Sequence, residues 1–173
     1  MSSLEQIADA KIQAATQRLI ADLDHEVKAI EHKNAALGVL KSGRTFKEVY
    51  RACETTLDRL LNTAKTEYGC VIKESVWPKA SVPNRLISDF RRHLQLILYA
   101  SKEHLEKIAT WIGNNKIHER LQSDLFALRD RTLTDLSLFI DGQFQVKKND
   151  LCKGIGAYVF GWFPRLFGFL KKG

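Results

Sequence analysis

Apolar residues recur every three or four positions along four stretches of this 173-residue chain, and glycines or prolines separate these stretches. This spacing puts them on one face of an α-helix. The first two stretches show it at Ile12, Leu19, Leu23, Val27, Ile30, Asn34 and Leu37, then at Phe46, Val49, Tyr50, Cys53, Leu57, Leu60, Leu61 and Ala64. The last two show it at Leu86, Ile87, Phe90, Leu94, Ile97, Leu98, Leu105, Ile108, Trp111 and Ile112, then at Ile117, Leu121, Leu125, Leu128, Thr132, Leu136, Phe139 and Ile140. The sequence therefore predicts an all-α fold, an antiparallel bundle of about four helices.

Capping and breaking residues predict where these helices begin and end. We expect helices at about 3–41, 45–69, 84–112 and 116–140, with a long, packed connection at 70–83. Ser3 is the expected N-cap of the first helix, in which a bend or break is expected near 34–38. Thr45 and Glu48 have the spacing of a capping box for the second helix. Asp141-Gly142 is the expected end of the fourth helix.

The C-terminal stretch 153–172 is different, because it holds six of the sixteen aromatic residues. Wound as a helix, it separates into two arcs, a division that only Gly156 breaks. One arc is bulky and apolar: Ile155, Tyr158, Val159, Phe160, Trp162, Phe163, Leu166, Phe167, Phe169 and Leu170. The other is small or cationic: Lys153, Gly154, Ala157, Gly161, Pro164, Arg165, Gly168, Lys171 and Lys172. The chain is therefore expected to end in an amphipathic helix rich in aromatic residues and glycine.

The net charge of +7 is concentrated in this same region. Residues 147–173 carry six basic side chains against one acidic side chain, whereas residues 1–146 carry 21 basic and 19 acidic ones. A nearly balanced body argues against nucleic-acid binding, and a cationic end favours an anionic membrane surface. We therefore divide the chain into a helical bundle, 1–146, and a cationic-aromatic segment, 147–173, that interacts with membrane or docks on protein.

The segment is too short and too charged for a good transmembrane helix. From Ile155 to Leu170 there are sixteen residues, with Arg165 among them, and a span needs about 20 apolar residues. A helix lying in the membrane interface fits better, with aromatic side chains at the acyl boundary and basic ones at the head groups. The predicted membrane-binding residues are Lys153, Tyr158, Phe160, Trp162, Phe163, Arg165, Leu166, Phe167, Phe169, Leu170, Lys171 and Lys172.

Small residues in the segment suggest a second role for it. Gly154, Gly161 and Gly168 recur every seven residues, and Ala157 with Gly161 forms a small-xxx-small pair that lets helices approach closely. These four residues are the predicted helix-packing surface of a homo-oligomer on the membrane. The alternative interpretation is that the bulky arc is a final core helix, covered by the chain's own bundle or by a protein partner.

No motif for catalysis or for a metal or cofactor site is recognisable. Asp22 and His25 have the spacing of the carboxylate-histidine motif of di-iron bundles, but the second motif that such a site needs is missing. Asp89 and His93 also resemble a ligand pair, but residues 91–93 are expected to form an ordinary exposed turn. Cys53 falls on an apolar stripe and is expected in the core. Cys152 lies beside Lys153 and is the candidate for a reactive thiol or for palmitoylation.

These observations lead to two hypotheses about function. The first is a non-enzymatic protein that associates with anionic membrane through its C-terminal segment, as an anchor or as a membrane-perturbing, pore-forming effector. The second is an adaptor or structural subunit whose C-terminal helix docks on a protein partner or on its own bundle. Three cysteines without C-x-x-C spacing and an N-terminus without a secretory signal predict a cytoplasmic protein, peripheral at the membrane.

Overall fold

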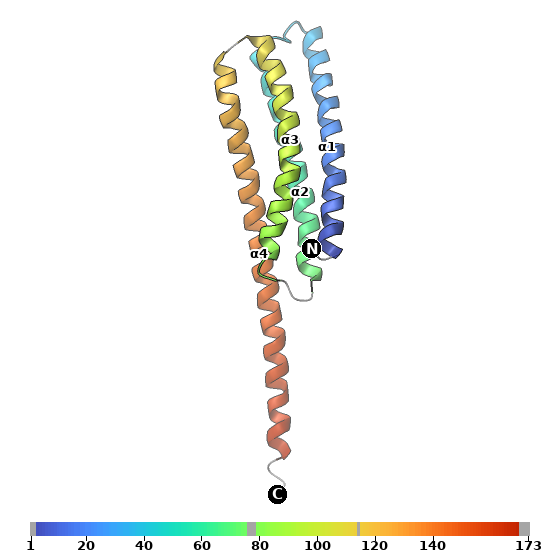
Figure 1. Cartoon of the computed structure of the whole chain (residues 1–173), viewed down its shortest axis with the longest axis vertical. Helices are drawn as coiled ribbons and strands as arrows, with labels where there is room; N and C mark the ends of the chain where they lie inside the picture. The colour runs from blue at the N-terminus through green and yellow to red at the C-terminus, as the bar shows by residue number, and fades with distance from the viewer. Residues whose placement is uncertain (1–2, 76–78, 114, 170–173) are drawn as a thin grey trace.

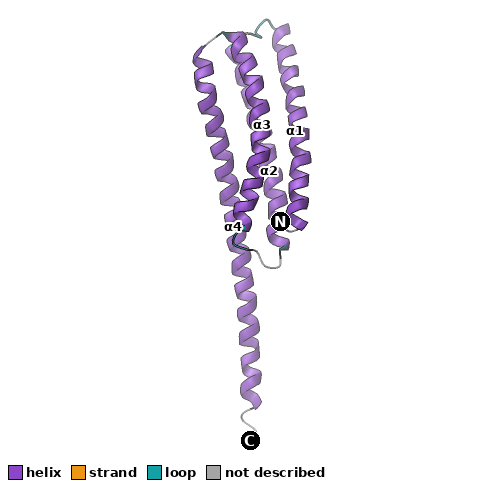
Figure 2. Ribbon diagram, viewed as in Figure 1, coloured by secondary structure: helices purple, strands orange, loops and turns teal. Residues whose placement is uncertain are grey.

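The computed structural model describes residues 3–75, 79–113 and 115–169; of these, the side chains of 115–116, 118–119 and 153–169 are not described. Four helices account for nearly all of these residues: α1 (Ser3–Ala36), α2 (Gly43–Glu74), α3 (Val82–Ile112) and α4 (Asn115–Phe169). No strand occurs within the described ranges (Figure 2). The predicted all-α fold with about four helices is confirmed.

Consecutive helices run in opposite directions (Figure 1). α2 and α3 pack against each other and against both remaining helices, whereas α1 and α4 do not contact each other in the described part of the chain. α2 and α3 are therefore the central pair, and α1 and α4 are two separate edge helices.

The core lies along the predicted stripes. The largest side chains with almost no exposure are Tyr68, Phe90, Ile12, Leu23, Leu57, Leu60, Ile72, Leu86, Leu94, Ile97, Leu105 and Ile108. Burying each such side chain contributes about 1.5–3 kcal/mol. Leu37, predicted to lie on the stripe of the first helix, is instead 56% exposed because it follows the end of α1.

The break predicted at 34–38 is confirmed. α1 ends at Ala36, and Gly38 has a φ of 69°, a left-handed conformation that glycine adopts without steric cost. The Val39 amide then donates to the Asn34 carbonyl at 2.9 Å, which closes the turn. The first helix is therefore shorter than the predicted 3–41.

Both predicted caps are wrong. Ser3 is the first helical residue of α1 rather than the residue before it. α2 begins at Gly43, and Thr45 is already inside it, where its hydroxyl donates to the Val39 carbonyl at 3.0 Å. Glu48 accepts instead from Arg44 and from the Asn34 amide group, both at 3.0 Å. Thr45 and Glu48 therefore link α2 to the end of α1 and to the turn that follows it.

The predicted connection at 70–83 is shorter than expected, because residues 70–74 belong to α2 and residues 82–83 belong to α3. α2 continues to Glu74 because Tyr68, Val71 and Ile72 extend its apolar stripe by another turn and are buried. Gly69 does not end the helix, and the ring of Phe139 of α4 packs beside it, 3.4 Å from where a Cβ would stand.

The predicted end of the fourth helix at Asp141-Gly142 is also wrong. α4 passes through Gly142 and continues to Phe169, so its 55 residues span about 82 Å. A single glycine costs a helix only about 1 kcal/mol, and α4 has bundle contacts on both sides of it. Ile140 is fully buried, and the Lys147 ammonium donates to the Lys73 carbonyl of α2 at 2.7 Å.

Candidate functional site

The C-terminal segment 147–173 is the continuation of α4. Figure 1 shows α4 leaving the end of the bundle at which α2 finishes and α3 begins, and running on along the bundle's long axis with no other helix beside it. The backbone is helical up to Phe169. The side chains of the two predicted arcs lie outside the described residues, and so do Leu170, Lys171 and Lys172 entirely, so the amphipathic arrangement stays a prediction.

The exit from the bundle is marked by Lys147. Its ammonium group reaches the Lys73 carbonyl, one of the last carbonyls of α2, which have no partner within the helix. A cation is favoured at this end of a helix, where the macrodipole is negative. Beyond it, Leu151 is half-buried, whereas Lys148, Asp150 and Cys152 are exposed. Lys147 is therefore the last polar link described between α4 and the bundle.

A row of ion pairs holds α1 against α3. Each pair has its acid on α1 and its base on α3: Glu5 with Arg85 at 2.9 Å, Asp9 with Arg92 at 3.5 Å, and Glu31 with Lys107 at 2.8 Å. Asp9 also contacts His93 at 2.9 Å, and Asp24 contacts His104 at 3.9 Å; these two contacts are ion pairs only when the imidazole is protonated. Lys11 and Lys33 of α1 similarly reach Glu67 and Glu48 of α2, at 2.8 and 4.0 Å. Among the described residues, every ion pair between two helices has one partner on α1.

The pKa values of these groups reflect the contacts. The pKa of Glu48 is lowered by hydrogen bonds from Arg44 and Asn34, and the pKa of Arg85 is raised by its hydrogen bonds to Glu5. The pKa of Asp24 is lowered mainly by Lys28, one turn along α1, and also by the nearby His104. The charged forms are thus favoured in the folded protein.

The histidine and aspartate candidates are not brought together in the part of the chain that the structure describes. Asp22 and His25 are exposed, and the described residues contain no group of three ligands suited to a metal ion. The prediction of an exposed turn at His93 is wrong, because His93 lies within α3, is buried and contacts Asp9. Asp89 pairs instead with Arg92 at 2.9 Å.

The three cysteines differ in environment. Cys53 is fully buried, as predicted, and burial raises the pKa of its thiol to about 11, which leaves it inert at neutral pH. Cys70 and Cys152 are exposed free thiols. The exposure of Cys152 is compatible with the predicted reactivity, which stays a prediction.

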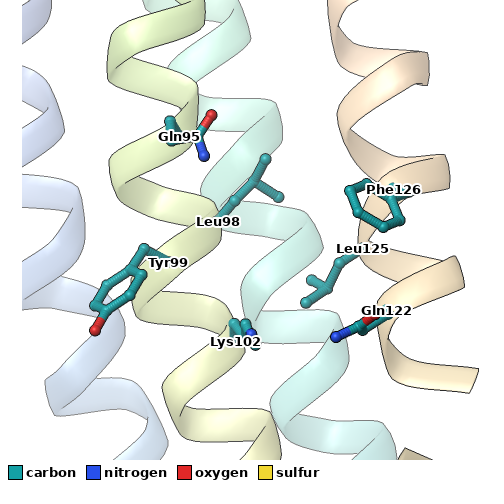
Figure 3. A pocket seen from close by; sticks show the side chains of 7 residues that line it. All are labelled: Gln95, Leu98, Tyr99, Lys102, Gln122, Leu125 and Phe126. Atoms are coloured by element: carbon teal, nitrogen blue, oxygen red, sulfur yellow. The ribbon is translucent and has the colours of Figure 1, made fainter. Parts of the chain in front are cut away.

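Sequence reasoning missed a groove between α3 and α4. It has a volume of about 270 Å³ and is lined by Gln95, Leu98, Tyr99, Lys102, Gln122, Leu125 and Phe126. In Figure 3, Leu98 and Leu125 point into the gap between the two helices, Phe126 lies at its opening, and Tyr99 points away from α4 at the outer rim. The sequence contained a signal for this groove, because Tyr99 and Phe126 are large apolar residues that lie off the predicted stripes.

Comparison with known proteins supplies no relative for this chain. No protein-family model matches it, and searches of curated proteins and of solved structures find no significant match. None of the helices that the structure describes is long and apolar enough to cross a membrane.

Proposed function

We propose that this protein is a non-enzymatic helical bundle that associates with anionic membrane through residues 147–173. One observation carries the proposal. α4 continues beyond the bundle, and this continuation contains most of the chain's excess positive charge and a large share of its aromatic residues. A helix of this composition that leaves the folded body is placed to meet another surface.

The chemistry of the segment suits a lipid surface. Each basic residue held near an anionic membrane contributes about 1 kcal/mol, and the segment has a net charge of +5. Its aromatic side chains favour the interface between head groups and acyl chains. Burial of their apolar surface there adds about 25 cal/mol to the binding free energy for each Å² removed from water. Charge and apolar burial thus act together at the same end of the chain.

Two roles follow from such binding. The protein acts as a peripheral anchor on the cytoplasmic face, or it perturbs the bilayer as an effector that assembles into pores. Assembly would use Gly154, Ala157, Gly161 and Gly168, which permit close helix approach. Replacing Gly161 and Gly168 with Leu should then leave attachment intact but reduce crosslinking and dye release from anionic vesicles at matched bound protein.

An adaptor function is the second candidate. The same bulky arc also suits an apolar groove on protein, and the groove between α3 and α4 shows that this chain itself offers one. In this case the segment would dock on a protein partner or on the bundle, and lipid would be dispensable.

Co-sedimentation with vesicles tests the proposal. We expect the full chain to bind vesicles of phosphatidylglycerol and phosphatidylcholine more tightly than vesicles of phosphatidylcholine alone, and a 1–150 truncation to bind neither. Reversing Lys171 and Lys172 to Glu should weaken binding. The matched control reverses Lys41 and Lys47, which are exposed at the opposite end of the bundle. Equal binding to the two vesicle types, or unchanged binding by the truncation, would exclude the proposed mechanism.

A further inference from the structure

Another cavity of the bundle, which we call the α2–α4 cleft, lies between α2 and α4. It has a volume of about 310 Å³, and its lining includes Leu57 and Leu128, which are 1% and 8% exposed. The cleft therefore has an apolar, buried base. Its volume is at the lower end of the range of small-molecule pockets, so it suits a small ligand rather than a protein segment.

The walls of the α2–α4 cleft carry charges of both signs. Arg51, Glu54 and Asp58 line it from α2, and Arg131 lines it from α4. Two guanidinium groups and two carboxylates balance each other, so these side chains give the cleft no net charge. An anion alone would face two carboxylates there, and a cation alone would face two guanidinium groups, and both are unfavourable.

These four charged side chains form no ion pair with any residue that the structure describes. Elsewhere in the bundle, opposite charges on neighbouring helices meet: Lys11 pairs with Glu67 at 2.8 Å, and Lys107 pairs with Glu31 at the same distance. Opposite charges that face one cavity without meeting leave room for a charged ligand between them.

The environment of Tyr50 shows that charges from both walls act near one place. The pKa of this α2 residue is raised mainly by burial and further by Glu54 and Asp124, whereas Arg131 lowers it. Glu54 of α2 and Arg131 of α4 are therefore both close enough to Tyr50 to influence it, although they do not pair with each other. The two walls face each other across a gap.

Two threonines add hydrogen-bond acceptors to the cleft. The Thr55 hydroxyl donates to the Arg51 carbonyl at 2.9 Å, and the Thr132 hydroxyl, on a residue only 6% exposed, donates to the Leu128 carbonyl at 2.8 Å. A hydroxyl that has donated its proton still has lone pairs that accept. The threonines therefore favour a ligand group that donates, such as ammonium, whereas the arginines favour one that accepts, such as carboxylate.

We propose that the α2–α4 cleft binds a small zwitterion that carries an ammonium group and a carboxylate, of the class of a free amino acid. Arg51 and Arg131 bind the carboxylate from the two walls, and Glu54 and Asp58 bind the ammonium group. The ligand thus supplies the partners that the four side chains lack, and the cleft stays neutral. The site uses no residue of the C-terminal segment 147–173, so it does not depend on the proposed membrane association.

Titration followed by NMR tests the proposal. The full chain, with its leucine and threonine methyl groups labelled, is titrated with each standard amino acid that has an uncharged side chain. We expect saturable shifts of the Leu128 and Thr132 methyl signals with at least one of them. Derivatives of that amino acid then separate its charges, because the N-acetyl form keeps only the carboxylate and the amide keeps only the ammonium group. Each derivative should bind about tenfold more weakly, since charge-assisted hydrogen bonds to one end are lost.

Two variants and their matched controls locate the site. Arg131→Gln and Asp58→Asn each remove one charge from an exposed side chain of the cleft, and each should weaken binding of the zwitterion about tenfold. In Arg131→Gln the preference for the zwitterion over the amide should also shrink. The controls are Arg129→Gln and Asp130→Asn, at two α4 residues that pair with each other outside the cleft. They should change binding less than about twofold.

Three results would overturn the inference. The first is that no amino acid of the panel gives saturable shifts at Leu128 and Thr132. The second is that a derivative with a single charge binds as tightly as the zwitterion, which would identify a simple ion site. The third is that Arg131→Gln and Asp58→Asn bind as tightly as the two controls. Circular dichroism checks that each variant is folded. Vesicle binding is measured separately and decides only the proposed function.

Discussion

The two edge helices, α1 and α4, occupy equivalent places but are attached in different ways. Each packs against α2 and α3, yet α1 forms the inter-helix ion pairs and also buries Glu5, Thr16 and Asn34. α4 buries an almost purely apolar stripe, Leu121, Leu125, Leu128, Thr132, Leu136 and Ile140. In the part of the chain that the structure describes, no ion pair joins α4 to another helix.

This difference predicts which helix responds to solution conditions. Exposed and half-exposed ion pairs weaken with salt and with protonation, whereas apolar burial is far less sensitive to either. α1 also buries Ile12, Leu23 and Val27, so salt and acid should weaken only the polar part of its attachment. The described contacts of α4 with other helices include no ion pair, so its attachment should change less under the same conditions.

The largest expected effect comes from the core side of α4. Leu136 is fully buried, and replacing it with Ala should lower the free energy of unfolding by about 3 kcal/mol, through lost apolar burial and the cavity left behind. Urea denaturation should give nearly the same loss in 0.05 M and 1 M NaCl. Leu138→Ala, two residues away but 68% exposed, should change stability by less than about 0.5 kcal/mol. A strong salt dependence for Leu136→Ala would contradict the proposed contrast.

Among the ion pairs of α1, the largest effect is expected at Glu5. Its side chain is only 3% exposed and accepts two hydrogen bonds from Arg85, at 2.9 and 3.1 Å. Glu5→Gln keeps the shape but removes the charge, so we expect a loss of about 1–3 kcal/mol that shrinks in high salt. Glu31→Gln, whose partner Lys107 is 46% exposed, is the control and should lose less than about 1 kcal/mol. Equal losses of unfolding free energy in Glu5→Gln and Glu31→Gln would show that burial does not make the Glu5–Arg85 ion pair the stronger one.

Acid should weaken the polar part of the attachment of α1 before it affects α4. The pKa of Glu48 is lowered from its ordinary value of 4.5 by hydrogen bonds from Arg44 of the same helix and from Asn34 of α1, so its stabilising contribution is complete above about pH 4.5 and is lost as pH falls through the lowered value. The pKa of Asp24 is lowered mainly by Lys28 of the same helix and in smaller part by His104 of α3, and its contribution is lost in the same direction. In Glu48→Gln this contribution to the pH dependence should disappear.

Cys53 offers a probe for this opening. It is fully buried and near both Ser101 of α3 and Glu26 of α1. With Cys70 and Cys152 replaced by Ser, its labelling by 4,4′-dithiodipyridine, normalised to an unfolded peptide, should rise between pH 6 and pH 3.5. Amide hydrogen exchange at residues 125–140 of α4 should stay slow over this range. Simultaneous loss of protection in α4 would mean global unfolding rather than release of α1.

The stripes and the break at Gly38 were predictable because periodicity and glycine act locally. The continuation of α2 through Gly69 and of α4 through Gly142 was not predictable, because both depend on contacts between segments that are distant in the chain. Phe139 packs beside Gly69, and Lys147 reaches the end of α2. Local glycine propensity is weaker than these contacts.

The candidate site was predictable in composition but not in surroundings. The sequence places aromatic and cationic residues at the end of the chain, and a helical backbone there follows from their period. It does not show that α1 and α4 lie on opposite edges, because the packing order of four similar amphipathic helices depends on three-dimensional fit. The groove beside Phe126 is a consequence of that order.

The smallest effect is expected at Lys147, and it tests where the bundle stops holding α4. Lys147→Met keeps an aliphatic stem but removes the bond to the Lys73 carbonyl and the cation near the negative end of α2. We expect a loss of about 0.3–1 kcal/mol, with faster hydrogen exchange in the last turn of α2 and in α4 beyond Gly142. Protection at Leu136 and Ile140 should persist, because their apolar contacts do not depend on this bond. Lys148→Met, at the exposed neighbouring position, is the matched control and should change neither exchange rate. If Lys147→Met instead releases α4 as far back as Leu136, the attachment of α4 is not mainly apolar, and the contrast between the two edge helices fails.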